Sequence, residues 1–194
     1  MNQSPEFEQI IQFIIEVEKL KQVNRMTKVV GTERFENSAE HSWQVALLAM
    51  SLSDYADKKI SMTRVVQMLL LHDVVEIDTG DKFAYATNHE DTENETEAAK
   101  RIFALLPQQI GDKYLTLWLE YEHKSSDDAV FAYAVDRLMP VLLNLHNQGQ
   151  SWRENGITLA QVIAKNCAVE KASKALWQHI LAKLEQAERD GWFN

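Results

Sequence analysis

The chain has few of the residues that break or cross-link secondary structure. Among its 194 residues there are one cysteine, three prolines and six glycines. A single cysteine excludes an internal disulfide and a zinc site built from several thiolates. So few turn-forming residues are untypical of an all-β chain of this length, which needs a turn after each short strand. The composition therefore favours a helical protein without a disulfide framework.

The chain also lacks an excess of positive charge and a long apolar run. Lysine and arginine number 20 against 29 acidic residues, so the formal net charge is -9. A negative surface repels nucleic-acid backbones and anionic membranes, so we expect neither as a partner. No run approaches the about 20 apolar residues that span a bilayer. The N-terminal MNQSPEFEQI lacks the basic and apolar regions of a signal peptide, so we expect a cytoplasmic protein.

Hydrophobic residues recur at helical spacing along most of the chain, which predicts an all-α fold. A length of 194 residues suits one domain, spanning 1–194. A first helix is expected after an N-cap at Ser4, burying Phe7, Ile10, Ile11, Ile14 and Val17. The other expected helices begin near Asn37 or cover 61–78, 90–106, 108–123, 127–147 and 158–189. The segments 79–90 and 148–157 are expected to be loops, and no strand is expected.

Two of these helices have start signals that satisfy their first backbone N–H groups. Asn37 is followed three residues later by Glu40, and Thr158 is followed three residues later by Gln161. Such pairs form capping boxes, in which each side chain accepts a hydrogen bond from the other residue's backbone. Both helix starts are therefore predicted from capping residues as well as from hydrophobic periodicity.

The segment LLLHDVVEIDTGD, residues 69–81, places several ionisable side chains at the end of an apolar helix. On a continuous helix His72 and Asp73 are about 100° apart, and Glu76 lies one turn further along the same face. Carboxylates near a helix C-terminus repel one another and oppose the helix dipole. A divalent cation would relieve both effects, whereas the ordinary alternative is a hydrogen-bonded His–Asp pair beside solvated carboxylates. Two ligands do not complete a metal site, so others must come from elsewhere.

Two distant residues are candidates for the missing ligands. His41 lies in NSAEHSWQVALLAM, one turn before Val45, and is therefore expected to point inward. Asp136 lies in VFAYAVDRLMPVLL, where burying an unpaired carboxylate would be costly. A salt bridge is the alternative for Asp136, but its neighbour Arg137 is a poor partner because adjacent helical residues face different directions.

The order His41, then His72-Asp73, then Asp136 resembles the HD-domain superfamily of metal-dependent phosphohydrolases. The segments SAEHSWQVA, LLLHDVVEIDTGD, LWLEYEH and AYAVDRLMP are similar to its branch of 5'-deoxynucleotidases and related small HD proteins, over about residues 10–147. The resemblance implies a helical bundle in which these four residues bind one divalent metal ion between helices. Their mixed nitrogen and oxygen donors leave the ion open among Mn, Co, Fe, Ni, Zn and Mg.

The resemblance also implies roles for two nearby carboxylates. Glu76 and Asp81 match the family's acidic pair at the same distances along the chain from His72. One is expected to orient or deprotonate the attacking water, and the other to protonate the leaving group or hold the sugar. The alternative is that either one orients His72. The loop over 79–90 is a candidate lid.

Two arginines precede His41 where related deoxynucleotidases carry substrate-contacting basic residues. Arg25 lies in KQVNRMTK and Arg34 in GTERFENS, and both are expected to bind the substrate. A surface salt bridge is the alternative for each. Met26 stands where the deoxynucleotidase pattern has an aromatic residue, so this departure leaves the nucleotide preference open.

The expected function is hydrolysis of a small phosphate ester, a 5'-deoxynucleoside monophosphate first of all, by a metal-activated water. One alternative is an HD hydrolase of a nucleoside triphosphate, an alarmone or a cyclic dinucleotide. The other is a non-catalytic regulatory module whose metal stabilises the bundle. Related small HD proteins are commonly homodimers, so a homodimer is expected. The helix over 158–189 would then pack on the bundle or lie at the dimer interface.

Overall fold

The computed structural model describes residues 5–85 and 92–193, and most of these are helical. The predicted helical fold class is therefore confirmed. The α-helices are α1 (Pro5–Val17), α2 (Ser38–Leu52), α3 (Met62–Leu71), α4 (Glu76–Thr79), α5 (Thr92–Phe103), α6 (Gln108–His123), α7 (Asp127–His146), α8 (Gln150–Glu154), α9 (Leu159–Asn166), α10 (Ala168–Ala172) and α11 (Lys174–Arg189). Short 3-10 turns are η1 (Glu18–Gln22), η2 (Ser53–Tyr55) and η3 (His72–Val75).

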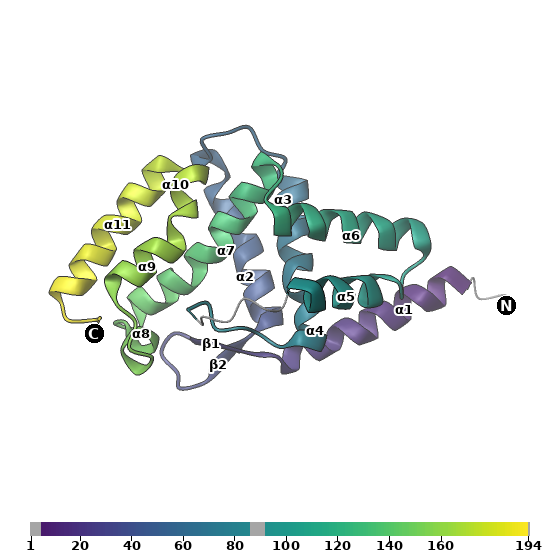
Figure 1. Cartoon of the computed structure of the whole chain (residues 1–194), viewed down its shortest axis with the longest axis horizontal. Coiled ribbons are helices and arrows are strands. Elements are labelled where there is room, and N and C mark those ends of the chain that lie inside the picture. The colour runs from purple at the N-terminus through teal and green to yellow at the C-terminus, as the bar shows by residue number, and fades with distance from the viewer. Residues whose placement is uncertain (1–4, 86–91, 194) are drawn as a thin grey trace.

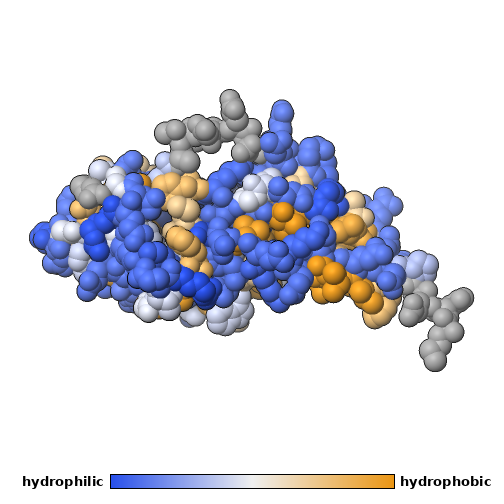
Figure 2. Space-filling view, turned by 90° about the horizontal axis from the view of Figure 1, so that it is seen from below, coloured by the Kyte–Doolittle hydropathy of each residue, from blue (hydrophilic) through white to orange (hydrophobic). Residues whose placement is uncertain are grey.

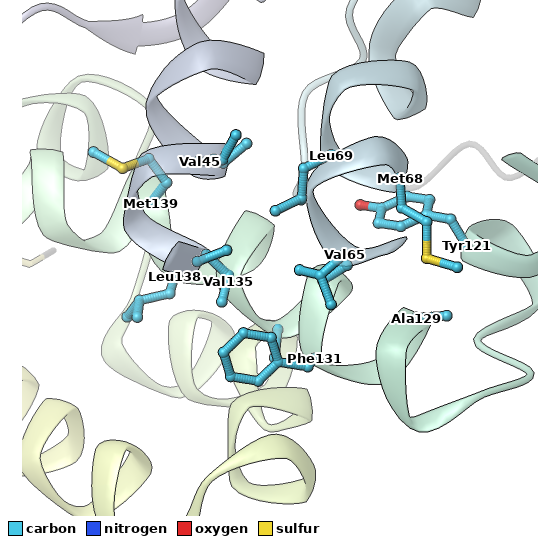
Figure 3. Close-up of a cluster of buried hydrophobic side chains, with 14 of the residues drawn as sticks. Val45, Val65, Met68, Leu69, Tyr121, Ala129, Phe131, Val135, Leu138 and Met139 are labelled. Atoms are coloured by element: carbon cyan, nitrogen blue, oxygen red, sulfur yellow. The ribbon is translucent and has the colours of Figure 1, made fainter. Parts of the chain in front are cut away.

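Helices α2, α3 and α7 form the centre of the molecule (Figure 1). Figure 3 shows their side chains meeting, among them Val45 of α2, Leu69 of α3 and Val135 of α7, which are all at most 1% exposed. Burying one such aliphatic side chain is worth about 1.5–3 kcal/mol relative to leaving it in water. This packing fixes the three helices relative to one another, and each of them carries or adjoins a candidate metal ligand.

Both predicted capping boxes are present. At the start of α2, the Glu40 N–H donates to the Asn37 side chain over 2.9 Å, and the Asn37 N–H donates to the Glu40 carboxylate over 3.3 Å. At the start of α9, Thr158 and Gln161 make the corresponding pair. The α2 box fixes the start of the helix one turn before His41. The predicted cap at Ser4 lies outside the described residues.

The single helix predicted over 61–78 is wrong, because α3 ends at Leu71. The chain then tightens into the 3-10 turn η3 and resumes as the short helix α4. Gly80 ends α4 with φ +73, a left-handed conformation that a residue with a side chain adopts only with strain. His72 and Asp73 therefore lie on the tighter turn.

The prediction that the chain has no strand is also wrong. β1 (Asn24–Lys28) pairs antiparallel with β2 (Phe35–Asn37) in a two-stranded sheet. The strands are short and read NRMTK and FEN, so they lack the alternation that identifies a longer strand. The hairpin runs along the lower edge of Figure 1 and leads directly into α2.

The C-terminal region differs from the one helix predicted over 158–189. It is divided into α9, α10 and α11, and α8 occupies part of the expected loop 148–157. Trp177, Ile180 and Leu184 of α11 are buried, and α10 packs against α7. This region forms the C-terminal side of the molecule (Figure 1). No helix in residues 5–85 and 92–193 is both long and apolar enough to cross a membrane.

The predicted burial of α1 is wrong for three residues. Phe7, Ile11 and Ile14 are 58%, 40% and 58% exposed, and the fully buried side chain of α1 is Phe13. Figure 2 shows hydrophobic side chains gathered toward the N-terminal end of the face seen from below. The helix is amphipathic as predicted, but much of its apolar face is open.

Candidate metal centre

Two histidines and two aspartates converge between the central helices. His41 of α2 places Nε2 2.9 Å from Oδ1 of Asp136 on α7. His72 of η3 places Nε2 3.4 Å from the same oxygen and 3.0 Å from Oδ1 of Asp73. Donor atoms of His41, His72 and Asp73 lie within 4.8 Å of one another, as they would around a single ion. All four side chains are buried, and together they offer two nitrogen and two carboxylate donors.

His72 is oriented so that one ring nitrogen faces the cluster. Its Nδ1–H donates to the carbonyl oxygen of Leu69 over 2.8 Å, and this hydrogen bond directs Nε2 inward. Within the described ranges, the buried Nε2 has no hydrogen-bond partner. The backbone of His72 is held as well, because the indole N–H of Trp118 donates to its carbonyl oxygen over 3.1 Å. A buried nitrogen without a partner, aimed at three other donors, fits a metal ligand.

Two further side chains support the cluster from behind, and sequence reasoning missed both. Tyr121 of α6 donates its hydroxyl to Oδ2 of Asp136 over 3.0 Å. Glu36 of β2 is 2% exposed and places Oε2 3.4 Å from Nδ1 of His41. The Tyr121 hydroxyl orients Asp136, whereas Oε2 of Glu36 and Nδ1 of His41 face each other without a hydrogen-bond partner among the described residues. Tyr121 lies in LWLEYEH, one of the segments that carry the family resemblance, so its position could have indicated a role at the site. Nothing in the sequence distinguishes Glu36 from a surface acid.

The predicted residues Arg25, Glu76 and Asp81 lie together beside this cluster. Nη1 of Arg25 donates to Oδ2 of Asp73 over 2.8 Å and lies 3.4 Å from Asp81 and 3.8 Å from Glu76. Ser38, at the start of α2, donates its hydroxyl to Oε2 of Glu76 over 2.5 Å. Nε of Arg25 also lies 3.7 Å from Oε2 of Glu36, so one cation faces four carboxylates and its charge does not neutralise them.

Excess negative charge shows in the proton affinities of the cluster. Burial and the charge of Asp73 raise the pKa of Glu76 to about 9, and burial also raises the pKa of Asp81. Burial alone would lower the pKa of His72, but Asp73 and Asp136 outweigh it and raise that pKa to about 9. Burial would likewise lower the pKa of Arg25, and Asp73 and Asp81 raise it instead. The cluster therefore attracts a cation, whether a proton or a metal ion.

The structure does not bring every predicted site residue to the cluster. Arg34 is exposed, and its Nη1 donates to the Glu40 carboxylate over 2.9 Å, so it takes the surface salt bridge that was the alternative. Two acids that were not among the predicted site residues also lie away from the cluster, and one of them, Glu120, pairs with Arg64 and accepts from Ser126. Asp78 pairs with Arg101 at the surface.

A pocket of about 220 Å³ opens over the cluster. Its walls include Arg25, Met26, Asp73, Glu76 and Asp136, together with the segment from Gly80 to Tyr85. The first part of the candidate lid over 79–90 therefore borders the pocket, and its remaining part lies outside the described residues. The pocket is of a size to admit a small molecule, and its floor carries the buried donors.

The fold and site define a helical protein with a buried centre of two histidines and two aspartates below a small pocket. The chain belongs to the HD-domain family, whose defining pattern matches residues 17–177. The expected resemblance is thereby confirmed.

Proteins similar to this chain include enzymes and a solved structure. The human 5'-deoxynucleotidase HDDC2 is 34% identical over 137 residues, which are 69% of this chain and 65% of the human protein. The 5'-deoxynucleotidase of Erwinia tasmaniensis is 29% identical over 132 residues, covering 63% of this chain and 66% of that protein. The crystal structure of a predicted metal-dependent phosphohydrolase from Magnetospirillum magnetotacticum is 39% identical, with a TM-score of 0.94 and coverage of 100% of this chain and 99% of that one.

Proposed function

We propose that this protein is a metal-dependent phosphohydrolase that releases phosphate from a 5'-deoxynucleoside monophosphate. The observation that carries the proposal is the convergence of His41, His72, Asp73 and Asp136 on one buried point, where the last three also line a pocket. The similar proteins named as 5'-deoxynucleotidases and as a metal-dependent phosphohydrolase support the same reaction class.

The four convergent residues would hold one divalent ion. When bound, such an ion lowers the pKa of water and offsets the charge of the phosphate. Tyr121 orients Asp136 through its hydrogen bond, and the Glu36 carboxylate lies 3.4 Å from Nδ1 of His41. Mixed imidazole and carboxylate donors suit first-row transition metals, and Mg stays a further candidate.

Arg25 and the two nearby carboxylates would handle the phosphate and the protons. Arg25 brings a fixed positive charge to the pocket wall, where it can pair with a phosphate oxygen. Glu76 and Asp81 are each within 4 Å of Arg25 and line the same pocket. One would take the proton of the attacking water and the other would supply the proton of the leaving oxygen. Met26, 42% exposed, lines the same pocket without an aromatic ring, so the proposal leaves the base preference open.

The proposal is tested by phosphate release. Metal-stripped protein is reloaded separately with Co, Mn, Mg or Zn and incubated with 5'- and 3'-nucleotides, deoxynucleotides and sugar phosphates. Release from 5'-deoxynucleotides that disappears in an Asp73→Ala control is the expected result. Release from triphosphates, alarmones or cyclic dinucleotides alone would point to another HD hydrolase. Stoichiometric metal without release from any compound would overturn the enzyme assignment in favour of a regulatory module.

We also propose that the protein is a homodimer, with the open face of α1 covered by a second copy. Four apolar residues spaced by three, four or one position form this face: Phe7, Ile11, Ile14 and Ile15, which are 40–66% exposed. Two copies of one amphipathic helix can cover each other's apolar stripe around a two-fold axis. Sedimentation velocity should show a dimer for the wild type and a monomer for Ile11→Asp/Ile14→Asp. A wild type that is monomeric at tens of micromolar would contradict the proposal.

A further inference from the structure

The pocket over the metal centre extends beyond the carboxylates to walls of the opposite charge. Its lining continues from Asp136 along α7 to Arg137 and Asn144, and reaches Trp152 of α8 and Lys165 of α9. Apart from Asp136 on α7, the acids that line the pocket beside the cluster include Asp73 of η3, Glu76 of α4 and Asp81, the residue after Gly80. One part of the pocket is therefore rich in carboxylates, whereas the part toward α9 presents two cations.

Arg137 is held at the boundary between these two parts. Its Nε lies 3.5 Å from Oδ2 of Asp136, and its guanidinium lies 5.1 Å from the centre of the Tyr133 ring. Nε is buried and, among the described residues, has no hydrogen-bond partner. The ring of Tyr133 stabilises the positive charge from one side, but a cation–π contact uses no N–H donor. Arg137 lines the pocket, so the terminal N–H groups of its guanidinium are the donors that it can direct to a ligand there.

Lys165 faces the same pocket from α9 and is half-buried. Over the described part of the chain, no carboxylate forms an ion pair with it. Burial lowers the pKa of its ammonium group, and the charge of Arg137 lowers it further. Two cations that repel each other in a partly desolvated pocket are destabilising, and an anion bound in the same pocket would offset that cost.

Asn144 of α7 adds a hydrogen-bond acceptor to the lining of the same pocket. It is 5% exposed, and its amide Nδ2–H donates to the Pro140 carbonyl over 3.0 Å. Its Oδ1 is buried without a hydrogen-bond partner among the residues described. A buried acceptor left unpaired costs free energy, so a ligand carrying an O–H or N–H donor would stabilise it. The same wall thus suits a partly protonated oxyanion, which both accepts and donates hydrogen bonds.

We propose that Arg137 and Lys165 form a subsite for a second anionic group, beside the centre that would hold the reacting phosphate. The subsite rests on the proposed function. It would narrow the substrate class to phosphate monoesters that carry another acidic group, such as a deoxynucleoside bisphosphate. Arg25 already provides a cation for the reacting phosphate. Lys165, on a separate helix and outside the carboxylate cluster, is left to bind the second group.

The test compares 2'-deoxyadenosine 5'-monophosphate with 2'-deoxyadenosine 3',5'-bisphosphate as substrates. We expect the bisphosphate to have a KM about tenfold lower in the wild type, because each charged hydrogen bond contributes to its binding. Lys165→Met should bring the ratio of the two KM values close to one, and Lys165→Arg should restore it. Lys183→Met, a change at an exposed lysine of α11, serves as the matched control and should keep the wild-type ratio.

Equal KM values in the wild type, or an unchanged ratio in Lys165→Met, would overturn the subsite. If neither ester is hydrolysed, the proposed function fails, and calorimetric binding of the bisphosphate still decides the subsite. Binding about tenfold weaker in Lys165→Met than in Lys183→Met would support it. Equal affinity of the two variants would overturn it. If Lys165→Met does not fold, Lys165→Gln takes its place in both measurements, because it removes the same charge with a shorter side chain.

Discussion

Glu76 combines burial with three charged neighbours, which suits a side chain that exchanges protons. It accepts a hydrogen bond from Ser38 and lies 3.8 Å from Arg25 without occupying a position of the ligand set. Glu76→Gln keeps the shape of the side chain but removes its ionisation. We expect metal content near that of the wild type and a kcat lower by about 10²–10⁴-fold, the usual contribution of a general acid or base. Metal analysis and phosphate release measure the two quantities.

Glu120→Gln is the matched control for this change. Glu120 makes its contacts to Arg64 and Ser126 rather than to the pocket, so its loss should leave turnover intact. Loss of metal in Glu76→Gln would show that Glu76 supports the ligands. Equal loss of turnover in both variants would show that turnover depends on the total negative charge of the region and not on Glu76 itself.

Tyr121 acts on the site through Asp136. Its hydroxyl donates to Oδ2 at 3.0 Å, which leaves Oδ1 facing His41 and His72. We expect Tyr121→Phe to weaken metal binding by about tenfold, because an oriented ligand binds more tightly than a free one. Competition with a chelator of known affinity measures this.

Tyr114→Phe is the control from the same helix. Its ring packs against Phe13 and Phe103 with centroid distances of 6.1 Å, away from the metal centre. Metal affinity that changes equally in both variants would mean that the hydroxyl of Tyr121 has no specific role.

At the scale of elements, the end of α4 determines where Asp81 lies. Gly80 has φ +73 and Gly191 has φ +74, and an added Cβ would meet no heavy atom within 4 Å at either position. Alanine at either site should therefore cost about 1–2 kcal/mol through backbone strain alone. Gly80→Ala should in addition reduce turnover, because Asp81 would leave its position 3.4 Å from Arg25.

Gly191→Ala separates strain from the displacement of Asp81. Urea unfolding should show similar losses of stability in the two variants, and phosphate release should fall in Gly80→Ala alone. Wild-type turnover in a destabilised Gly80→Ala would show that the position of Asp81 is not critical.

Helical periodicity predicted most of the helices but not where they break. The 3-10 turn over His72–Val75 follows an apolar run with the same spacing as the helix before it, so no residue marks the change. The hairpin of β1 and β2 was missed because its strands of five and three residues are largely polar. Amphipathicity of α1 was evident, but periodicity does not tell whether another element covers the apolar face. These features depend on tertiary packing, which overrides local preference.

For the site as well, residues marked by a local sequence pattern were predicted and residues placed by tertiary packing were not. His41, His72, Asp73 and Asp136 were identifiable because ionisable residues inside apolar helices are costly without a partner. Arg25 was predicted beside them, and the hairpin is the element that brings it there. Glu36 comes with that hairpin and had no signal of its own, since an acid in a short strand is ordinarily exposed. Arg34 was predicted on the same ground as Arg25, its place before His41 in the sequence. Only the structure shows that Arg25 lies at the cluster and Arg34 at the surface.

At the scale of the molecule, the free energy of unfolding should depend on which cation, a proton or a metal ion, binds the buried acidic centre. The formal net charge is -9, and the cluster concentrates carboxylates that Arg25 alone does not offset. A protein that binds a metal ion in its native state and not when unfolded gains stability with metal concentration. Protons and metal ions compete for the same donors, so pH should shift this gain.

Metal-free protein should lose stability as pH rises, because two buried groups bind protons more tightly in the fold. The pKa of His72 is raised from 6.5 to about 9 in the fold, so its proton stabilises the native state fully below pH 6.5. That contribution is lost as pH rises through 9, and Glu76, raised from 4.5 to about 9, shifts stability in the same direction. Metal-free protein should therefore lose on the order of 3 kcal/mol for each of the two groups between pH 6.5 and 9. A bound divalent ion replaces the proton, so the Tm difference between metal-loaded and chelator-treated protein should widen over this range. Thermal unfolding at pH 6.5, 7.5 and 8.5 measures it, and Asp73→Ala should show almost no difference at any pH. A metal-free Tm that rises with pH would refute the assignment of raised proton affinity to the buried centre.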